Sequence, residues 1–261
     1  MKKRIIALLF AALPTLGFAE VPNYEWQSIK VDLTDKAALQ DGARTFANYC
    51  MGCHGAKFQR YERVADDLGI SEELMMENLV FPSDAKYGDH MKASMTPDQA
   101  KKWFGVAPPD LTLVARVRGN DWVYNYMRSF YVDESRPFGV NNVVFPNVGM
   151  PNVLVHLQGV QTVGTAQVQA VDEKGKKVFD PLTGTPLTKE SDNELTVLPK
   201  TGTLTEAEFD QKIQNLVTFL AYSANPVKLQ SQRIGTYVLL FLAFFFVFAY
   251  FLKREYWKDV H

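Results

Sequence analysis

Both cysteines of this 261-residue chain lie in one short motif, Cys50–His54, with the sequence C-M-G-C-H. One closely spaced pair cannot staple a domain of this size, and a structural zinc site needs four Cys or His ligands. A thioredoxin-like dithiol follows a strand within a βαβ pattern. Here the preceding residues have helical spacing, with small or apolar side chains on one face: Ala43, Phe46, Ala47 and Cys50. The motif is therefore expected on a helix or directly after one.

A histidine directly after the second cysteine is the arrangement that attaches a c-type haem. Each thiol adds to one vinyl group of the porphyrin, and His54 is then carried under the iron as its proximal ligand. Small residues, Gly52 and Gly55, leave room beside the ring. The single motif predicts one covalent haem c. The alternative, a redox-active dithiol, predicts free thiols and no haem absorbance.

The N-terminal segment, residues 1–19, has the pattern of a secretory signal peptide. Lys2, Lys3 and Arg4 precede a short apolar run, and Gly17-Phe18-Ala19 ends it with small residues at the offsets of a cleavage site. An uncleaved anchor is the alternative, but Pro14 interrupts the run. Export suits haem c, which is attached outside the cytoplasm.

A second apolar run, Ile234–Leu252, contains no charged residue. Its nineteen residues would span roughly 28 Å as a helix, about the thickness of one hydrocarbon core. Positive charges follow it, which suits a cytoplasmic tail over residues 253–261. We therefore expect a transmembrane anchor at 233–252 and a periplasmic domain at 20–232, held at the inner membrane by a single pass. A buried core helix is the alternative.

The charge of the predicted external part is about −6, from 21 Lys and Arg against 27 Asp and Glu. An acidic surface argues against nucleic-acid binding and is compatible with a basic protein partner. Ordinary solubility would explain the same charge.

An electron-transfer haem usually takes a second axial ligand from Met or His. Met150 lies in the segment F-P-N-V-G-M-P-N-V-L, where prolines and a glycine break helix and strand and can present one side chain to a metal. The rivals are Met91 and Met95, with His90 close by. Met51 lies inside the attachment loop, and the remaining methionines of the predicted domain have helical spacing typical of core residues: Met75, Met76 and Met127. His156 also stays a candidate, whereas His261 lies in the predicted cytoplasmic tail. Local reasoning leaves the choice between Met150 and its rivals open.

Two further segments have recognisable patterns. Residues 158–203 are rich in Thr, Gly and Lys, with strand-like alternation at A-Q-V-Q-A-V and a turn signal at E-K-G-K-K, which predicts a hairpin on the surface. The segment after it predicts a helix with Thr205 as N-cap and Glu208 three residues on. Its apolar stripe comprises Phe209, Ile213, Leu216, Val217 and Leu220.

Several blocks together resemble one family. They are NYCMGCHGAKFQRYERVADDLGI, APPDLTLVARVRGNDWVYNYMRSFY, NNVVFPNVGMPNVL, and LVTFLAYSANP before the C-terminal apolar run. In content and order they are similar to bacterial cytochrome c1, the haem c subunit of the quinol:cytochrome c oxidoreductase, or bc1 complex. The resemblance covers about residues 30–261. It implies a mainly α, cytochrome c-like haem domain with long insertions and one C-terminal transmembrane helix.

The resemblance also implies roles for individual residues. Cys50 and Cys53 would bond the haem, and His54 and Met150 would be the two iron ligands. Pro108 and Pro109 match the prolines that wall the ring. Arg116 matches the arginine that binds a haem propionate, and Arg118 lies nearby. The apolar residues around Arg116 suggest that its helix is partly buried, which would call for an anionic partner.

The function implied is electron transfer rather than catalysis by this chain alone. The subunit would accept one electron from the Rieske iron–sulfur protein and pass it to cytochrome c, with cytochrome b as a further partner in a dimeric complex. Two alternatives stay open: a membrane-anchored periplasmic thiol–disulfide oxidoreductase, and a haem c subunit of a different respiratory complex.

Overall fold

The computed structural model describes residues 22–172 and 176–259, in two compact units. One unit holds residues 22–24 and Val163–Thr196, and the other begins at Glu25 and holds the remaining described residues. The predicted signal peptide, residues 1–19, lies outside the described residues, and so does the centre of the predicted turn, residues 173–175.

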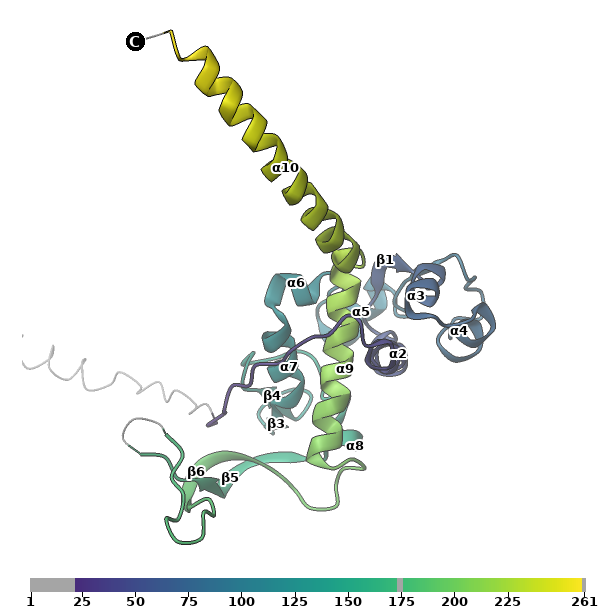
Figure 1. Cartoon of the computed structure of the whole chain (residues 1–261). Coiled ribbons are helices and arrows are strands. Elements are labelled where there is room, and N and C mark those ends of the chain that lie inside the picture. The colour runs from purple at the N-terminus through teal and green to yellow at the C-terminus, as the bar shows by residue number, and fades with distance from the viewer. Residues whose placement is uncertain (1–21, 173–175, 260–261) are drawn as a thin grey trace, which may run out of the picture. The chain divides into compact units, whose positions relative to one another are not determined.

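The larger unit is mainly helical (Figure 1). Its helical segments are α2 (Lys36–Thr45), a π-helical turn η1 (Phe46–Cys50), α3 (Tyr61–Leu68), α4 (Glu72–Asn78), α5 (Pro97–Phe104), α6 (Val114–Arg118), α7 (Asn120–Arg128), α8 (Val155–Gln158), α9 (Glu206–Ala224) and α10 (Lys228–Tyr256). Two short antiparallel pairs join them: β1 (Ala56–Arg60) with β2 (His90–Met91), and β3 (Phe130–Val132) with β4 (Val140–Asn142). This agrees with the predicted mainly α class.

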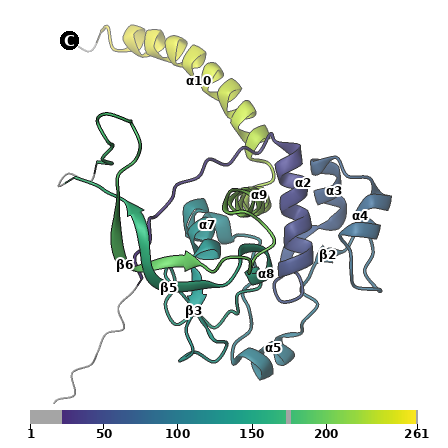
Figure 2. The same ribbon diagram turned by 90° about the horizontal axis from the view of Figure 1, so that it is seen from below.

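The centre of this unit is the packing of α2 against α9, with α7 on the other side of α9 (Figures 1 and 2). Gly42 makes the close approach possible, because a Cβ atom there would lie 2.1 Å from the backbone oxygen of Asn215. Near this contact the rings of Phe46 and Phe219, both fully buried, pack together with their centroids 5.6 Å apart. The first helix of the described residues, α2, and the helix before α10 therefore share one core.

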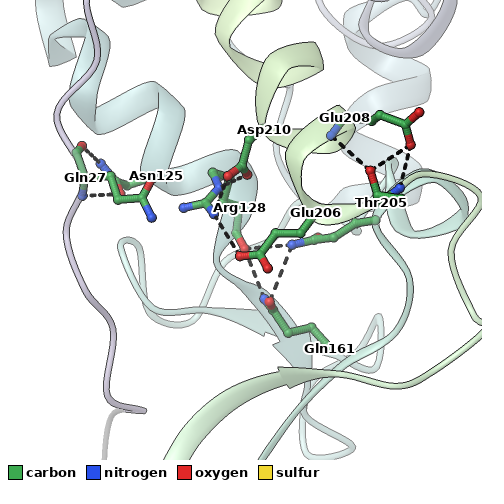
Figure 3. Close-up of polar contacts among 9 residues, drawn as sticks. Gln27, Asn125, Arg128, Gln161, Thr205, Glu206, Glu208 and Asp210 are labelled. Carbon is green, nitrogen blue, oxygen red and sulfur yellow. Dashed lines mark hydrogen bonds and ion pairs between the residues drawn. The ribbon is translucent and has the colours of Figure 1, made fainter. Parts of the chain in front are cut away.

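Helix α9 begins as predicted. The side chain of Thr205 accepts a hydrogen bond from the backbone N–H of Glu208, whose carboxylate accepts from Thr205 in return (Figure 3). This reciprocal cap satisfies N–H groups that the first turn of a helix leaves without partners. The predicted apolar stripe is confirmed, since all its members are buried: Phe209, Ile213, Leu216, Val217 and Leu220.

Polar contacts tie α9 to its neighbours on two sides. Arg128 of α7 donates two hydrogen bonds to the carboxylate of Asp210, at 2.5 and 3.1 Å (Figure 3). On the other side, Asp41 of α2 accepts from Lys212 at 2.8 Å and from Asn215 at 2.9 Å. Burial by itself would raise the pKa of Asp41, but the hydrogen bonds from Asn215, Lys212 and Arg44 hold that pKa below its usual value.

The smaller unit contains most of a two-stranded sheet, in which β5 (Gln161–Gln169) pairs with β6 (Thr188–Val197). Exposed and half-buried residues alternate along β5, as predicted for a strand on the surface. Across the pair, Thr165 donates a hydrogen bond to Asp192 at 2.6 Å. Asn23 joins the same unit through hydrogen bonds to Asp192 and Glu194.

Helix α10 is long and apolar enough to cross a membrane. It begins at Lys228 and ends at Tyr256, so it extends past the predicted anchor, 233–252, at both ends. None of its residues is buried against the rest of the chain. The polar face of an ordinary surface helix is missing over Ile234–Leu252, and this favours lipid as the surroundings.

Candidate functional site

The attachment motif begins at Cys50, the last residue of the π-helical turn η1. The backbone N–H groups of Cys53 and His54 both donate to the carbonyl of Cys50, at 3.0 and 2.8 Å. The predicted helical face is confirmed, because Ala43, Phe46, Ala47 and Cys50 are all buried. Packing of this face against α9 therefore holds the motif in one place.

A cavity of about 350 Å³ opens next to the motif. Its walls include six of the predicted site residues: Cys50, Cys53, His54, Pro108, Pro109 and Met150. Most of the remaining lining is apolar or aromatic and comes from α7, α9 and the loops before α6 and α8. Segments from four parts of the sequence thus meet around one apolar space that holds two thiols, one imidazole and one thioether.

His54 is buried, with 8% of its surface exposed, and its ring orientation is fixed. Its Nδ1 lies 2.7 Å from the carbonyl oxygen of Pro109, and because a carbonyl can only accept, Nδ1 carries the proton. Burial lowers the pKa of His54, although the bond to Pro109 and the charge of Asp110 act in the opposite direction. A neutral imidazole with Nδ1–H bonded to a carbonyl offers Nε2 as the metal-binding nitrogen.

The proline loop is tied to the chain directly after His54. The N–H of Leu111 donates to the carbonyl of Gly55 at 2.7 Å, and the carboxylate of Asp110 accepts from the N–H of Lys57 at 2.8 Å. A side chain at Gly55 would lie within 3.1–3.3 Å of three atoms, which include one oxygen of Asp110. Glycine at position 55 therefore suits this close contact, which keeps the Pro109 carbonyl facing the imidazole.

Met150 is presented by an irregular loop, as its sequence context predicts. Asn142 precedes this loop and is fully buried. Its side-chain oxygen accepts hydrogen bonds from the N–H groups of Val144 and Phe145, both at 3.0 Å, and its side-chain nitrogen donates to the carbonyl of Tyr126 at 2.7 Å. The hydroxyl of Tyr126 in turn donates to Sδ of Met150 at 3.4 Å. Buried polar side chains therefore shape the loop and hold the thioether at the cavity wall.

The rivals of Met150 lie elsewhere. Met91 is buried in β2, and neither Met91 nor Met95, His90 or His156 is among the residues that line the cavity. Met127, expected in a helix core, lies on α7, is 7% exposed and borders the cavity. Of the candidates from irregular segments, Met150 is the one that the structure brings to the motif.

The two arginines of α6 differ in position. Arg118 lines the cavity, and its guanidinium lies 5.0 Å from the ring centroid of Trp122. Arg116 is exposed and is not among the lining residues, and its neighbour Val117 is 75% exposed. The helix is partly buried as expected, through Ala115, but Arg116 itself faces outward, so burial adds no support for an anionic partner there and its propionate role stays a prediction.

Cys50 does not have the surroundings of a reactive thiol. Burial, followed by the proximity of Cys53, raises the pKa of the Cys50 thiol to about 12. A dithiol catalyst instead needs a thiolate, whose pKa neighbouring positive charge or a helix N-terminus lowers. The donor set fits a c-type haem better: thiols at the attachment spacing, one imidazole with a fixed tautomer, one thioether and apolar walls.

Sequence reasoning missed three residues that shape this site: Tyr126, Trp122 and Asn142. All three lie within the blocks that carry the family resemblance. Their spacing, however, gives no sign that Tyr126 meets Met150 or that Asn142 supports the loop. Both contacts join elements that become neighbours only when the chain folds.

Comparison with known proteins agrees with the site. The model of the Cytochrome C1 family matches residues 26–178 and 200–260. Cytochrome c1 of Allochromatium vinosum is 47% identical over the full length of both chains. Cytochrome c1 of Rhodobacter capsulatus is 22% identical over 98% of this chain and 97% of its own.

Another relative has a different name. The ammonia monooxygenase gamma subunit of Nitrosomonas europaea is 38% identical over all of this chain and 99% of its own. The family match nevertheless includes the attachment motif, the proline loop, the methionine loop and the C-terminal helix. The chain therefore belongs to the cytochrome c1 family, as a haem c electron-transfer subunit of a respiratory complex.

Proposed function

We propose that this chain is the haem c subunit of a bc1 complex. It accepts one electron from a Rieske iron–sulfur protein and passes it to a cytochrome c, beside cytochrome b in a dimeric assembly. The observation that carries the proposal is the cavity at which Cys50, Cys53, His54 and Met150 meet. The identity with a curated cytochrome c1 supports the choice of complex.

Each of these residues has a distinct task. The thiols of Cys50 and Cys53 form thioether bonds that keep the cofactor attached. Nε2 of His54 and Sδ of Met150 would bind the iron, and Pro108 and Pro109 would wall the ring. A bound haem c supplies one-electron redox chemistry, so the chain itself needs no general acid, general base or nucleophile. A thioether is a softer ligand than a second imidazole, and this choice favours a high reduction potential.

An arginine provides the counter-charge for a propionate. The resemblance assigns this role to Arg116, whereas the position of Arg118 at the cavity wall supports Arg118 as the donor. A planar guanidinium fits a carboxylate with two parallel hydrogen bonds. Arg118 also stacks on Trp122, which limits its rotamers and keeps it at the wall.

The haem domain lies on the periplasmic side of the inner membrane, and α10 crosses the membrane once. The signal-peptide pattern and the positive charges after the apolar run support this orientation. Protease added to spheroplasts should degrade the haem domain and spare cytoplasmic markers. Protection of the domain until the membrane is broken would contradict the orientation.

Covalent attachment is tested by a denaturing gel of the membrane fraction stained for haem peroxidase activity. A stained band should appear at the mass of the mature chain and vanish in the Cys50→Ala/Cys53→Ala variant. Free thiols in an unstained wild-type band would instead support a dithiol protein. Met150→Leu should keep the stained band and lower the reduction potential sharply. An unchanged potential in Met150→Leu would exclude Met150 as the ligand.

Partners are tested by purification of the tagged chain from membranes in mild detergent. Cytochrome b and a Rieske protein should co-purify in a quinol-oxidising complex. The second candidate is a haem c subunit of a different complex, which the name of the Nitrosomonas europaea relative brings into consideration. Subunits of an oxygenase in place of cytochrome b would favour that candidate and leave the haem site unaffected.

A further inference from the structure

Four side chains follow one another along the cavity wall, from its exposed edge to Met150. The guanidinium of Arg118 lies 5.0 Å from the centroid of Trp122, and the Trp122 and Tyr126 rings stack with centroids 5.0 Å apart at an angle of 9°. Trp122 and Tyr126 are four positions apart on α7 and project from the same face of that helix, whereas Arg118, the last residue of α6, reaches Trp122 across the break at Gly119. The row of four side chains ends where the Tyr126 hydroxyl meets Sδ of Met150.

Aromatic contacts leave the Tyr126 ring little freedom. Trp122 covers one face, and Phe130, fully buried, contacts it edge-on with centroids 5.2 Å apart. Phe145, from the methionine loop, contacts Trp122 in the same manner at 6.4 Å. The hydroxyl is therefore held at one point by the stack, independently of the methionine that it meets.

We propose that Tyr126 is a positioning residue for Met150, which it aims at the iron and whose donor strength it lowers. This inference rests on the proposed function, in which Met150 is the second axial ligand. A thioether sulfur has two lone pairs, so one can accept from Tyr126 while the other points to the metal. The hydrogen bond draws electron density from sulfur. Because Fe(III) depends more than Fe(II) on that density, the bond raises the reduction potential.

The hydroxyl has a second effect on the ligand. Met150 lies on an irregular loop, where no helix or strand restrains its side chain. A bond from a fixed donor keeps Sδ at the cavity wall while the iron–sulfur bond is broken, so that methionine rebinds before an outside ligand enters. The proposal thus joins two measurable quantities, the potential and the resistance of Met150 to displacement.

Tyr126→Phe removes the hydroxyl and keeps the ring and its stacking. Tyr124→Phe is the matched control, because Tyr124 lies on the same helix, is buried, and is not among the residues that line the cavity. The reduction potential of both variants and wild type should be titrated with a redox mediator series, and the rate at which imidazole binds the ferric haem should be measured by rapid mixing. Met150→Leu completes the set.

In Tyr126→Phe we expect a lower potential and imidazole binding to the ferric haem that is about 2- to 10-fold faster, the factor of one net hydrogen bond. The haem stain on a denaturing gel should stay, and Tyr124→Phe should match wild type. An equal potential and an equal rate of imidazole binding in Tyr126→Phe, with both altered in Met150→Leu, would overturn the inference and leave the proposed ligands intact. If Met150→Leu matches wild type, the assignment of Met150 fails, and the role of Tyr126 fails with it.

Discussion

Gly42→Ala should weaken the core more than the size of one methyl group suggests. The new Cβ would lie 2.1 Å from the backbone oxygen of Asn215 and 2.8 Å from Cβ of Phe219. Ordinary contacts at such a site begin at 3.4 Å, so α2 and α9 would have to separate by about 1.3 Å. Neither contact is with the flexible end of a side chain, and the overlap cannot be relieved by a change of rotamer.

The magnitude follows from two opposing effects. Overpacking of a core costs about 1–3 kcal/mol, and a backbone clash belongs at the upper end of that range. Alanine offsets about 1 kcal/mol of this loss of stability, because it favours a helix more than glycine does. We expect a net loss of about 2 kcal/mol in the free energy of unfolding. For a domain of this size the melting temperature should fall by about 4–8 °C.

Thermal unfolding of the full haem-loaded chain in detergent, followed by circular dichroism, measures this loss. Gly164→Ala in β5 is the control, since nothing lies within 4 Å of a Cβ atom at Gly164. Both substitutions restrict the unfolded chain alike, so their difference reports the folded state. A melting temperature for Gly42→Ala equal to that of the control would refute the argument, because α2 and α9 would then have room for a side chain.

Three other expectations concern the site and its supports. Asn142→Ala removes the fully buried acceptor of the Val144 and Phe145 N–H groups and should cost about 2 kcal/mol in a denaturant titration, whereas a loss below about 1 kcal/mol would show that the loop keeps its shape without this side chain. The depressed pKa of Asp41 means that its stabilising effect is full at neutral pH and is lost as the pH falls below its ordinary value of 3.8. Asp41→Asn should therefore be less stable than wild type near neutral pH, and the gap should close in urea titrations at roughly pH 3, where an undiminished gap would contradict the sign. Arg118→Gln should shift the haem potential more than Arg116→Gln does in a redox titration, and the reverse order would return the propionate role to Arg116.

Elements with a strong local signal could be predicted from the sequence. The helix before the motif, the capped helix α9 and the strands of the hairpin each follow from periodicity and from residues a few positions apart. The methionine loop was expected as an irregular segment, because proline and glycine exclude regular structure around Met150. The family resemblance added that the attachment motif, the proline loop and the methionine loop belong to one site, which hydrophobic periodicity cannot indicate.

Contacts between distant segments could not be predicted in this way. Nothing near Gly42 shows that the carbonyl of Asn215 will touch it, and Tyr126 reads as one more aromatic residue on an amphipathic helix. The position of Arg116 on its helix could not be predicted for a similar reason. Apolar neighbours correctly indicated a partly buried helix, but which of its faces meets the core depends on packing with segments far along the chain.

The crossing of α2 and α9 also orders events in time. One helix comes early in the described chain and the other just before the long apolar helix α10, so the core closes only after almost the whole domain has been synthesised. Cys50 is 6% exposed once folded, so under the proposed function its thiol would be accessible for haem attachment until α9 docks and brings Leu216 and Leu220 to the cavity. Haem delivery would then compete with closure of the core, and a substitution that slows the docking of α9 would leave more time for haem delivery.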